Sequence, residues 1–166
     1  MTSDRPMRRS PRLQGYDYSQ EGAYFITICS HRREHILGHV KNQTCNLFQA
    51  GLIAIEDWQK IPTHYPSVEL DAFVVMPNHI HGIIFLVGEG FIPPAAKPPK
   101  SVLLSQIIGG YKAGVTRRIN RSNLYANTVW QRSFHDHIIR SEEELNRIRH
   151  YVANNPALWE HDRFYG

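Results

Sequence analysis

Runs of apolar residues predict four strands along the chain. Segments 23–30 (AYFITICS), 68–76 (VELDAFVVM) and 79–87 (HIHGIIFLV) are rich in the aromatic and β-branched residues that favour strands. Only a Pro-Asn pair separates the second segment from the third, so we expect these two to form an antiparallel hairpin. A last strand region is expected within residues 127–140 (NTVWQRSFHDHIIR).

Apolar residues at helical spacing and capping signals predict three helices. The first covers residues 44–60 (TCNLFQAGLIAIEDWQK), and the second covers 101–121 with its opening serine as the N-cap. The third begins at a capping box formed by Ser141 and Glu144 and stops at Pro156.

The order of these elements predicts the fold class. It runs strand, helix, two hairpin strands, helix, strand, helix, with a Pro/Gly-rich loop expected at residues 88–100. Strands that follow one another directly pair antiparallel, and helices cover the sheet. We therefore expect an α+β fold of the ferredoxin-like type, an antiparallel sheet with helices packed on one face.

Composition and charge add a basic arm and an anionic partner to this picture. The chain has 166 residues, of which 42% are hydrophobic and 20% charged, as in one globular domain. Residues 1–21 are polar and carry several arginines, which predicts an arm followed by a single domain over 22–166. The net charge of +4 favours an anionic partner.

The cysteines and the hydropathy pattern predict a cytoplasmic location without membrane contact. Cys29 and Cys45 are too few for a disulfide framework and lie in no zinc-finger spacing. The sequence contains neither an apolar signal segment nor a run long enough to cross a bilayer.

Two histidines in the third predicted strand form a candidate metal pair. His79 and His81 lie at i and i+2, so they point to the same face with backbones about 6.7 Å apart. Imidazoles at this separation can converge on one divalent cation. Ile80 points into the core, and Gly82 leaves room beside the pair. The alternative is two histidines on a solvated sheet face.

The last helix offers the groups that such a pair lacks. Tyr151 and Asn155 are separated by four residues and share a helical face, so a helix laid over the sheet could aim both at the histidines. Tyr151 is then a candidate nucleophile, and the Asn155 amide oxygen suits Mg²⁺ or Mn²⁺. The alternatives are a core aromatic for Tyr151 and a C-cap before proline for Asn155.

A second alternating histidine pair occurs at His135 and His137. By the same strand rule these two share a face, with Asp136 pointing away. We do not assign them as metal ligands. They could contact DNA or lie near the active site, but a structural role is favoured.

Together, PNHIHG after an apolar strand, the segment VWQR…FHDHIIR and a later YVANNP resemble the HUH single-strand DNA transposases with one catalytic tyrosine. The chain is most similar to the REP-associated tyrosine transposases, which are insertion-sequence-200-like, from RLQGYDYSQEGAYFITIC to YVANNP. The resemblance implies that His79 and His81 are the metal pair, that Tyr151 is the nucleophile and that Asn155 completes the metal site. Relatives often have the longer glutamine at that last position.

The resemblance also implies the reaction and the partner. Tyr151 would cleave single-stranded DNA with Mg²⁺ or Mn²⁺, leaving a 5′-phosphotyrosine link and a free 3′-OH that can rejoin strands. The partner would be DNA with palindromic hairpin repeats, and the location nucleoid-associated. Whether the chain acts alone or as a homodimer stays open.

Basic and aromatic side chains outside this site are candidates for DNA contacts. Single-stranded binding combines phosphate contacts with base stacking. The phosphate candidates are Arg8, Arg9, Arg12, Lys112, Arg117 and Arg118, and the stacking candidates are Tyr16 and Tyr18.

Two other functions compete with the transposase. One is a domesticated, catalytically silent protein that grips hairpin DNA without cutting it. The other is a metal-dependent RNA phosphoesterase, but such enzymes need a longer histidine alternation, and here Ile83 and Phe85 occupy the next positions.

Overall fold

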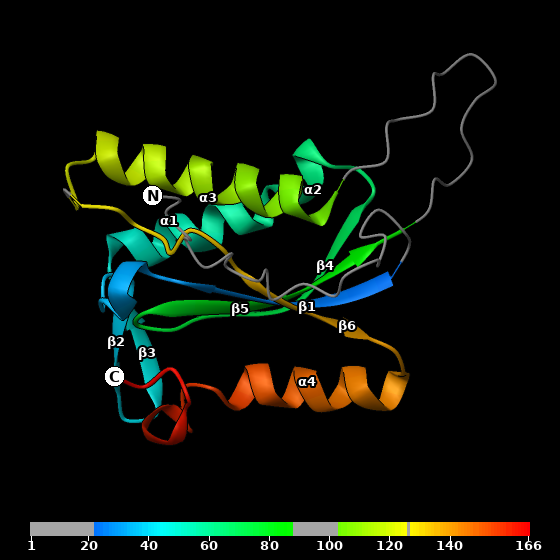
Figure 1. Ribbon diagram of the computed structural model, residues 1–166. Coiled ribbons are helices and arrows are strands. Elements are labelled where there is room, and N and C mark those ends of the chain that lie inside the picture. Colours follow the sequence, from blue (N-terminus) through cyan, green and yellow to red (C-terminus); the bar gives the residue numbers. More distant parts are fainter. Residues whose placement is uncertain (1–21, 88–102, 126) are drawn as a thin grey trace, which may run out of the picture.

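A four-stranded antiparallel sheet forms the centre of the computed structural model, which describes residues 22–87, 103–125 and 127–166 (Figure 1). Its order is β4 (Val68–Val75), β5 (His79–Leu86), β1 (Gly22–Cys29) and β6 (His135–Ile139). The two middle strands pair along their whole length, with Cys29 opposite His79 and Thr27 opposite His81. The predicted strands and the antiparallel α+β class are therefore confirmed.

Helices cover both faces of the sheet, which corrects the expectation of one covered face (Figure 1). On one face lie α1 (Gln49–Gln59), α3 (Leu104–Arg121) and the short α2 (Ile61–His64). On the other lies α4 (Glu142–Asn154), followed by the turn η2 (Trp159–His161). All residues of β5 but Phe85 are buried, because both of its faces are covered. A strand covered on one face would alternate between apolar and polar positions, and β5 does not.

The core between the sheet and α1 explains the glycine beside the histidines. Trp58 of α1 is buried and stacks on Phe73 of β4 at 4.6 Å between ring centroids. A Cβ atom on Gly82 would lie 2.3 Å from the Trp58 ring. Gly82 therefore makes room for Trp58 on the face away from His81, and not for the histidine pair as predicted.

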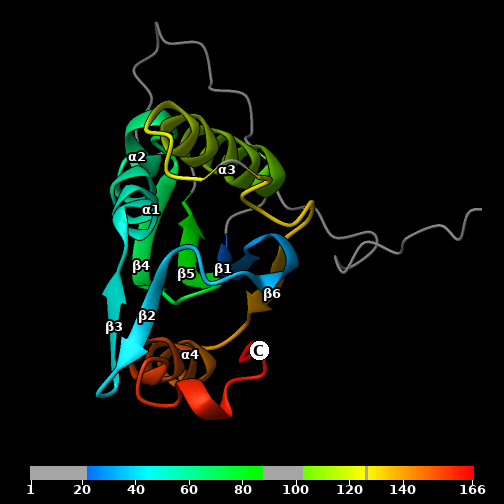
Figure 2. The same ribbon diagram turned by 90° about the vertical axis from the view of Figure 1, so that its left-hand side faces the viewer.

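A hairpin at residues 38–47 was not predicted. It consists of β2 (Gly38–Lys41) and β3 (Thr44–Leu47), so the first residues of the helix predicted at 44–60 are a strand. Asn42 and Gln43 connect the two strands, and both have positive φ angles, 51° and 59°. Two-residue turns of this kind usually contain Asn-Gly. The hairpin lies at one end of the sheet and reaches from the α1 side toward the chain's C-terminal segment (Figure 2).

The N-terminal cap that the sequence predicts for the last helix is present in part. At α4, the Ser141 hydroxyl accepts from the Glu144 amide at 3.1 Å, while the Glu144 carboxylate accepts from the Arg140 amide at 2.9 Å. The cap is thus present, with its return bond shifted by one residue. The Ser101 cap and the whole of the predicted loop 88–100 lie outside the described residues. None of the described helices combines the length and the apolar character needed to cross a bilayer.

Candidate metal and nucleophile site

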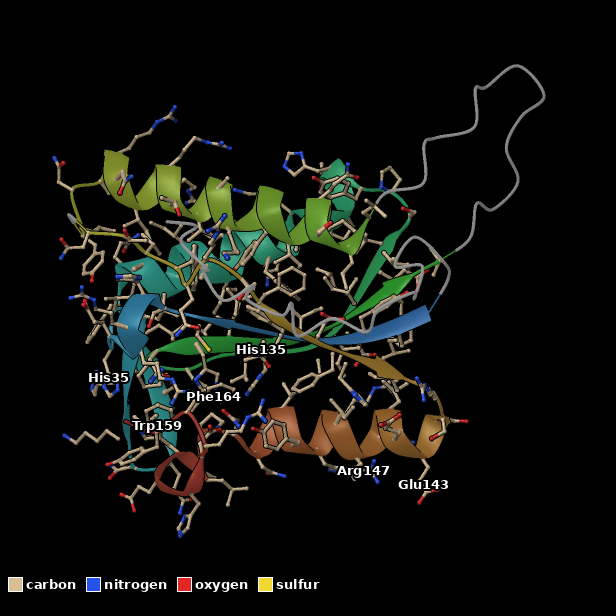
Figure 3. All side chains as sticks on the ribbon, in the orientation of Figure 1. His35, His135, Glu143, Arg147, Trp159 and Phe164 are labelled. Atoms are coloured by element: carbon tan, nitrogen blue, oxygen red, sulfur yellow. The ribbon has the colours of Figure 1, made fainter. Side chains whose placement is uncertain are left out.

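His79 and His81 project from the start of β5 toward α4. Both are buried, and their ring centroids lie 4.5 Å apart with the planes at 68°. Trp159 and Phe164 from the C-terminal segment lie beneath this end of the sheet (Figure 3). The Phe164 ring lies 4.7 Å from the ring of His79 and 5.6 Å from that of His81, so the pair faces the protein interior and not solvent.

Hydrogen bonds fix the orientation of each imidazole. The Asn78 amide nitrogen donates to the Phe164 carbonyl at 2.8 Å, which leaves Asn78 Oδ1 to accept from His79 Nδ1 at 2.8 Å. The lone pair of His79 is therefore on Nε2. His81 Nδ1 lies 2.8 Å from the Thr27 hydroxyl of β1. Partners of this kind orient imidazoles that bind metals.

Helix α4 brings the predicted nucleophile to the same place. The Tyr151 hydroxyl lies 3.5 Å from His81 Nε2, and its ring packs edge-on against Phe25 of β1 at 6.1 Å. The side chain is 37% exposed, so the phenol borders both the buried pair and solvent. One turn later Asn155 is buried beside it.

Asp162 joins this site, and sequence reasoning missed it. One of its oxygens accepts from the Asn155 amide at 2.8 Å and from the Tyr151 hydroxyl at 3.4 Å, and the other accepts from the Phe164 amide at 2.7 Å. It lies beyond the proline that ends α4, where no helical or strand period relates it to the histidines. The only feature of the sequence that could have pointed to Asp162 is its acidic side chain in the C-terminal segment.

The residues present fit a divalent cation. The ligand atoms of His79, His81 and Asp162 all lie within 4.8 Å of one another. His79 Nε2 and Asn155 Oδ1 are buried and have no hydrogen-bond partner in the described chain while His79 is neutral; a protonated His79 would donate to Asn155, which raises the His79 pKa. Buried polar atoms normally have partners, so two orphaned acceptors beside a carboxylate indicate an electrophile between them. Nitrogen and oxygen ligands together suit Mn²⁺, and the oxygens also suit Mg²⁺.

Burial sets the protonation of the site. It lowers the pKa of His79 to about 4, although the nearby Asp162 carboxylate acts in the opposite direction. Burial also holds the pKa of His81 well below its usual value, and His79 adds to the effect. Burial, and then Asp162, raise the pKa of Tyr151. The imidazoles are thus neutral at pH 7, as ligands must be, and the phenol keeps its proton.

A cavity of about 550 Å³ opens beside the tyrosine. It is lined by Phe25, Thr27, His81, His135, Asp136, His137, Arg147, Ile148, Tyr151 and Arg163. His135 and His137 face it from β6, where they lie opposite Thr27 and Phe25 of β1, and His135 is seen on the α4 side of the sheet (Figure 3). The prediction that the two share a face is confirmed. His137 also contacts the Glu144 carboxylate at 2.6 Å.

Helix α3, which carries three of the predicted DNA contacts, lies on the opposite face of the sheet from α4, the helix of Tyr151 (Figure 1). Lys112 Nζ donates to the Gln131 carbonyl at 2.7 Å, and Arg118 donates to Asp57 and Glu56 at 2.5 Å. Arg117 is exposed. The candidates on the arm, Arg8, Arg9, Arg12, Tyr16 and Tyr18, lie outside the described residues.

Comparison with known proteins gives relatives in both sequence and structure, although no known family description matches the chain. An uncharacterised protein of Haemophilus influenzae is 42% identical, covering 95% of this chain and 93% of its own length. A second Haemophilus influenzae protein, described as "Putative REP-associated tyrosine transposase", is 24% identical and covers 85% of this chain and 73% of its own length.

Two solved structures share the fold. The structure of a REP-associated tyrosine transposase bound to a REP hairpin covers 92% of this chain and 74% of its own, with a TM-score of 0.62 and 21% identity. A "putative transposase" from Deinococcus radiodurans covers 86% and 95%, with a TM-score of 0.50 and 18% identity. The fold is thus that of the HUH transposases. The chain is thus similar in sequence to a putative REP-associated tyrosine transposase and in fold to a solved member of that family.

Proposed function

We propose that this chain is a metal-dependent DNA transposase that cleaves and rejoins single strands beside hairpins through a 5′-phosphotyrosine intermediate. One observation carries the proposal: the Tyr151 hydroxyl lies 3.5 Å from His81 Nε2 and 3.4 Å from Asp162 Oδ2. Three separate segments of the chain thus bring a phenol, a histidine pair and a carboxylate together at one point.

The substrate class rests on the relatives and on charge. The structural neighbour in this family is bound to a REP hairpin. The positive net charge of this chain fits a polyanion, and residues 1–21 include several arginines, which pair with phosphates. A palindromic DNA hairpin is therefore the partner that we infer, and the nucleoid is the location that follows from it.

The chemistry is a transesterification at phosphorus. The phenolic oxygen of Tyr151 attacks the phosphorus, and the bond from phosphorus to the 3′ oxygen breaks. Asp162 Oδ2, 3.4 Å from the phenolic oxygen, would accept the phenolic proton and return it to the departing 3′ oxygen, which leaves as a free 3′-OH. The 5′ phosphate remains esterified to Tyr151. Attack by a 3′-OH reverses the step and rejoins the strand without ATP.

Four side chains would hold the cation: His79, His81, Asp162 and Asn155. When bound, Mg²⁺ or Mn²⁺ polarises the scissile phosphate and stabilises its negative charge. The neutral imidazoles provide lone pairs, and Thr27 and Asn78 keep them oriented. All of these groups come from one chain, so a monomer suffices for the site and a homodimer is not required.

Cleavage of a labelled hairpin oligonucleotide with a single-stranded flank tests the proposal. With Mn²⁺ we expect a covalent protein–DNA adduct on a denaturing gel, and no adduct from Tyr151→Phe. Tyr165→Phe is the matched control, because Tyr165 is also exposed and also in the C-terminal region. An adduct that survives in Tyr151→Phe would refute the assigned nucleophile. Tight hairpin binding without an adduct in any metal would favour the catalytically silent binding protein.

A further inference from the structure

Two arginines from different elements line the cavity beside Tyr151. Arg147 lies on α4 one turn before the proposed nucleophile, and Arg163 lies in the C-terminal segment directly after Asp162. Both arginines are exposed, and His81 borders the same cavity of about 550 Å³. A phosphodiester that reaches the Tyr151 hydroxyl therefore lies between walls that carry positive charge.

Few of the surrounding groups neutralise this charge. Arg163 forms no ion pair with any residue that the structure describes, and Arg147 reaches Glu144 only at 3.8 Å, with 71% of its side chain exposed. The one acid among the described residues of the cavity lining is Asp136. It lies on β6 between the two histidines that face the cavity, so its side chain points to the opposite face of the sheet. Both guanidinium groups are therefore available to an anionic ligand.

An aromatic contact holds Arg163 beside the histidine pair. Its guanidinium carbon lies 4.7 Å from the centroid of the Phe164 ring, and that ring lies 4.7 Å from the ring of His79. A guanidinium that stacks on a ring still presents its N–H donors in its own plane. Burial, and then Asp162, raise the pKa of Tyr151, and the charge of Arg163 acts in the opposite direction. The positive charge therefore lies close enough to act on the phenol.

The proposed reaction needs positive charge at this place. As the Tyr151 oxygen bonds to phosphorus, the non-bridging oxygens of the phosphate gain negative charge. A guanidinium offers parallel N–H groups that match a pair of phosphate oxygens, and it stays protonated throughout the working range of pH. It therefore stabilises charge and transfers no proton.

We propose that Arg163 is a catalytic residue whose guanidinium binds the non-bridging oxygens of the phosphate that Tyr151 attacks and stabilises their negative charge. The inference rests on the proposed function: the bond from phosphorus to the Tyr151 oxygen forms, the bond to the 3′ oxygen breaks, and Arg163 keeps its protons. The alternative is that Arg163 only covers the Phe164 ring. Arg33 contacts the same ring, at 5.5 Å, but does not line the cavity, so it distinguishes the two roles.

Rates of Mn²⁺-dependent adduct formation, at saturating concentrations of the labelled hairpin with a single-stranded flank, test this role. Arg163→Gln removes the charge and should slow the reaction about a hundredfold, as the loss of one transition-state donor does. Arg163→Lys keeps a charge without the planar fork and should recover part of the rate. Arg33→Gln loses the matching contact with Phe164 and should react at the native rate. A native rate in Arg163→Gln, or an equal loss in Arg33→Gln, would overturn the inference.

A scan with methylphosphonate linkages identifies the phosphate contact itself. Each hairpin carries one such uncharged linkage in its flank, and its affinity is measured in Tyr151→Phe protein, which lacks the nucleophile. One linkage should weaken binding about tenfold, as the loss of a hydrogen bond to a charged group does. Adding Arg163→Gln should remove most of that difference, because the contact is then already absent. Misfolding would lower the affinity for every hairpin alike and cannot produce this pattern.

The two measurements separate this inference from the proposed function. If native protein forms the adduct but no linkage depends on Arg163, the inference alone fails. If one linkage depends on Arg163 but native protein forms no adduct in any metal, the transposase proposal alone fails and the phosphate contact stands. When both are observed, the linkage that depends on Arg163 should be the one that is cleaved, and a different linkage would overturn the catalytic role.

Discussion

Asp162, which is half-buried, supplies the carboxylate of the His79–His81–Asp162 group. Asp162→Asn keeps the size of the side chain and removes its charge, so we expect Mn²⁺-dependent adduct formation to fall at least tenfold. Glu160→Gln is the control, since Glu160 is exposed two residues earlier. Rates from gel-resolved time courses at saturating DNA give the comparison; equal rates in Asp162→Asn and native protein would remove Asp162 from the site.

The buried histidines make the stability of the metal-free protein depend on pH. The pKa of His79 is about 4 in the folded state and near 6.5 when unfolded, so between these values the unfolded chain binds more protons. Stability is therefore full above pH 6.5 and falls as the pH drops toward 4. At ~1.36 kcal/mol per pH unit, His79 alone accounts for roughly 3 kcal/mol.

Urea unfolding in EDTA from pH 4.5 to 7.5 measures this slope. The free energy of unfolding of His79→Gln should change less steeply with pH than that of the native protein. His161→Gln, an exposed histidine, should keep the native slope and serves as the control. Equal slopes in His79→Gln and native protein would mean that His79 is accessible to protons in the folded state.

The close packing of Gly82 against Trp58 in the core can be tested by substitution. An alanine Cβ there would lie 2.3 Å from the Trp58 ring, so Gly82→Ala should destabilise the protein by about 1–3 kcal/mol through overpacking. Gly109→Ala in α3 meets nothing within 4 Å and should stabilise by up to ~1 kcal/mol, because alanine favours helix. Chemical unfolding gives both values, and a neutral Gly82→Ala would contradict this packing.

At the scale of the elements, a bidentate ion pair links α4 to β4, in addition to the contact of His137 with Glu144. Arg149, two residues before the nucleophile, donates to Asp71 from Nε at 2.9 Å and from a terminal nitrogen at 2.5 Å. Asp71 lies where the β4–β5 register shifts, between Leu70 and Phe73. The irregularity in β4 thus presents a carboxylate to the helix and fixes the turn that carries Tyr151.

Breaking this pair should displace the nucleophile but should lower the stability of the fold only slightly. Both side chains are partly exposed, so Arg149→Gln should cost no more than ~1 kcal/mol of stability. We expect adduct formation to fall about tenfold with unchanged hairpin affinity. The swap Asp71→Arg/Arg149→Asp should recover part of the rate. A swap no faster than the single variants would mean that the pair does not position α4.

The sequence predicts the helices and strands better than it predicts how they pack against one another. The predictions that were wrong have physical causes. Strands β1, β4 and β5 follow from their own β-branched runs, and Tyr151 with Asn155 from helical spacing. The helix predicted at 44–60 began too early because its leucines suit either a strand or a helix, and the decisive turn at Asn42-Gln43 lacks a glycine. The two covered faces and the contact of Asp162 depend on how segments pack, which no local period encodes.

At the scale of the whole molecule, one cation would join three segments distant in sequence: β5 through the histidines, α4 through Asn155 and the C-terminal segment through Asp162. A ligand bound only by the folded state stabilises it, by ~2.7 kcal/mol at a hundred times its Kd. For a chain of this size, that corresponds to a rise in Tm of about 5–10 °C. We expect this rise when Mn²⁺ is added to untagged protein in calorimetry.

Variants of the ligands should separate site binding from general effects of the ion. His79→Gln/His81→Gln should lose most of the rise, and Asp162→Asn part of it, whereas His135→Gln/His137→Gln should keep it, because that pair lies on β6 outside the buried cluster. Binding of Mn²⁺ to histidines of the unfolded chain would lower Tm and so cannot imitate the result. An equal rise in native protein and in His79→Gln/His81→Gln would show that the cation binds elsewhere, and the orphaned acceptors at His79 and Asn155 would then need a different partner.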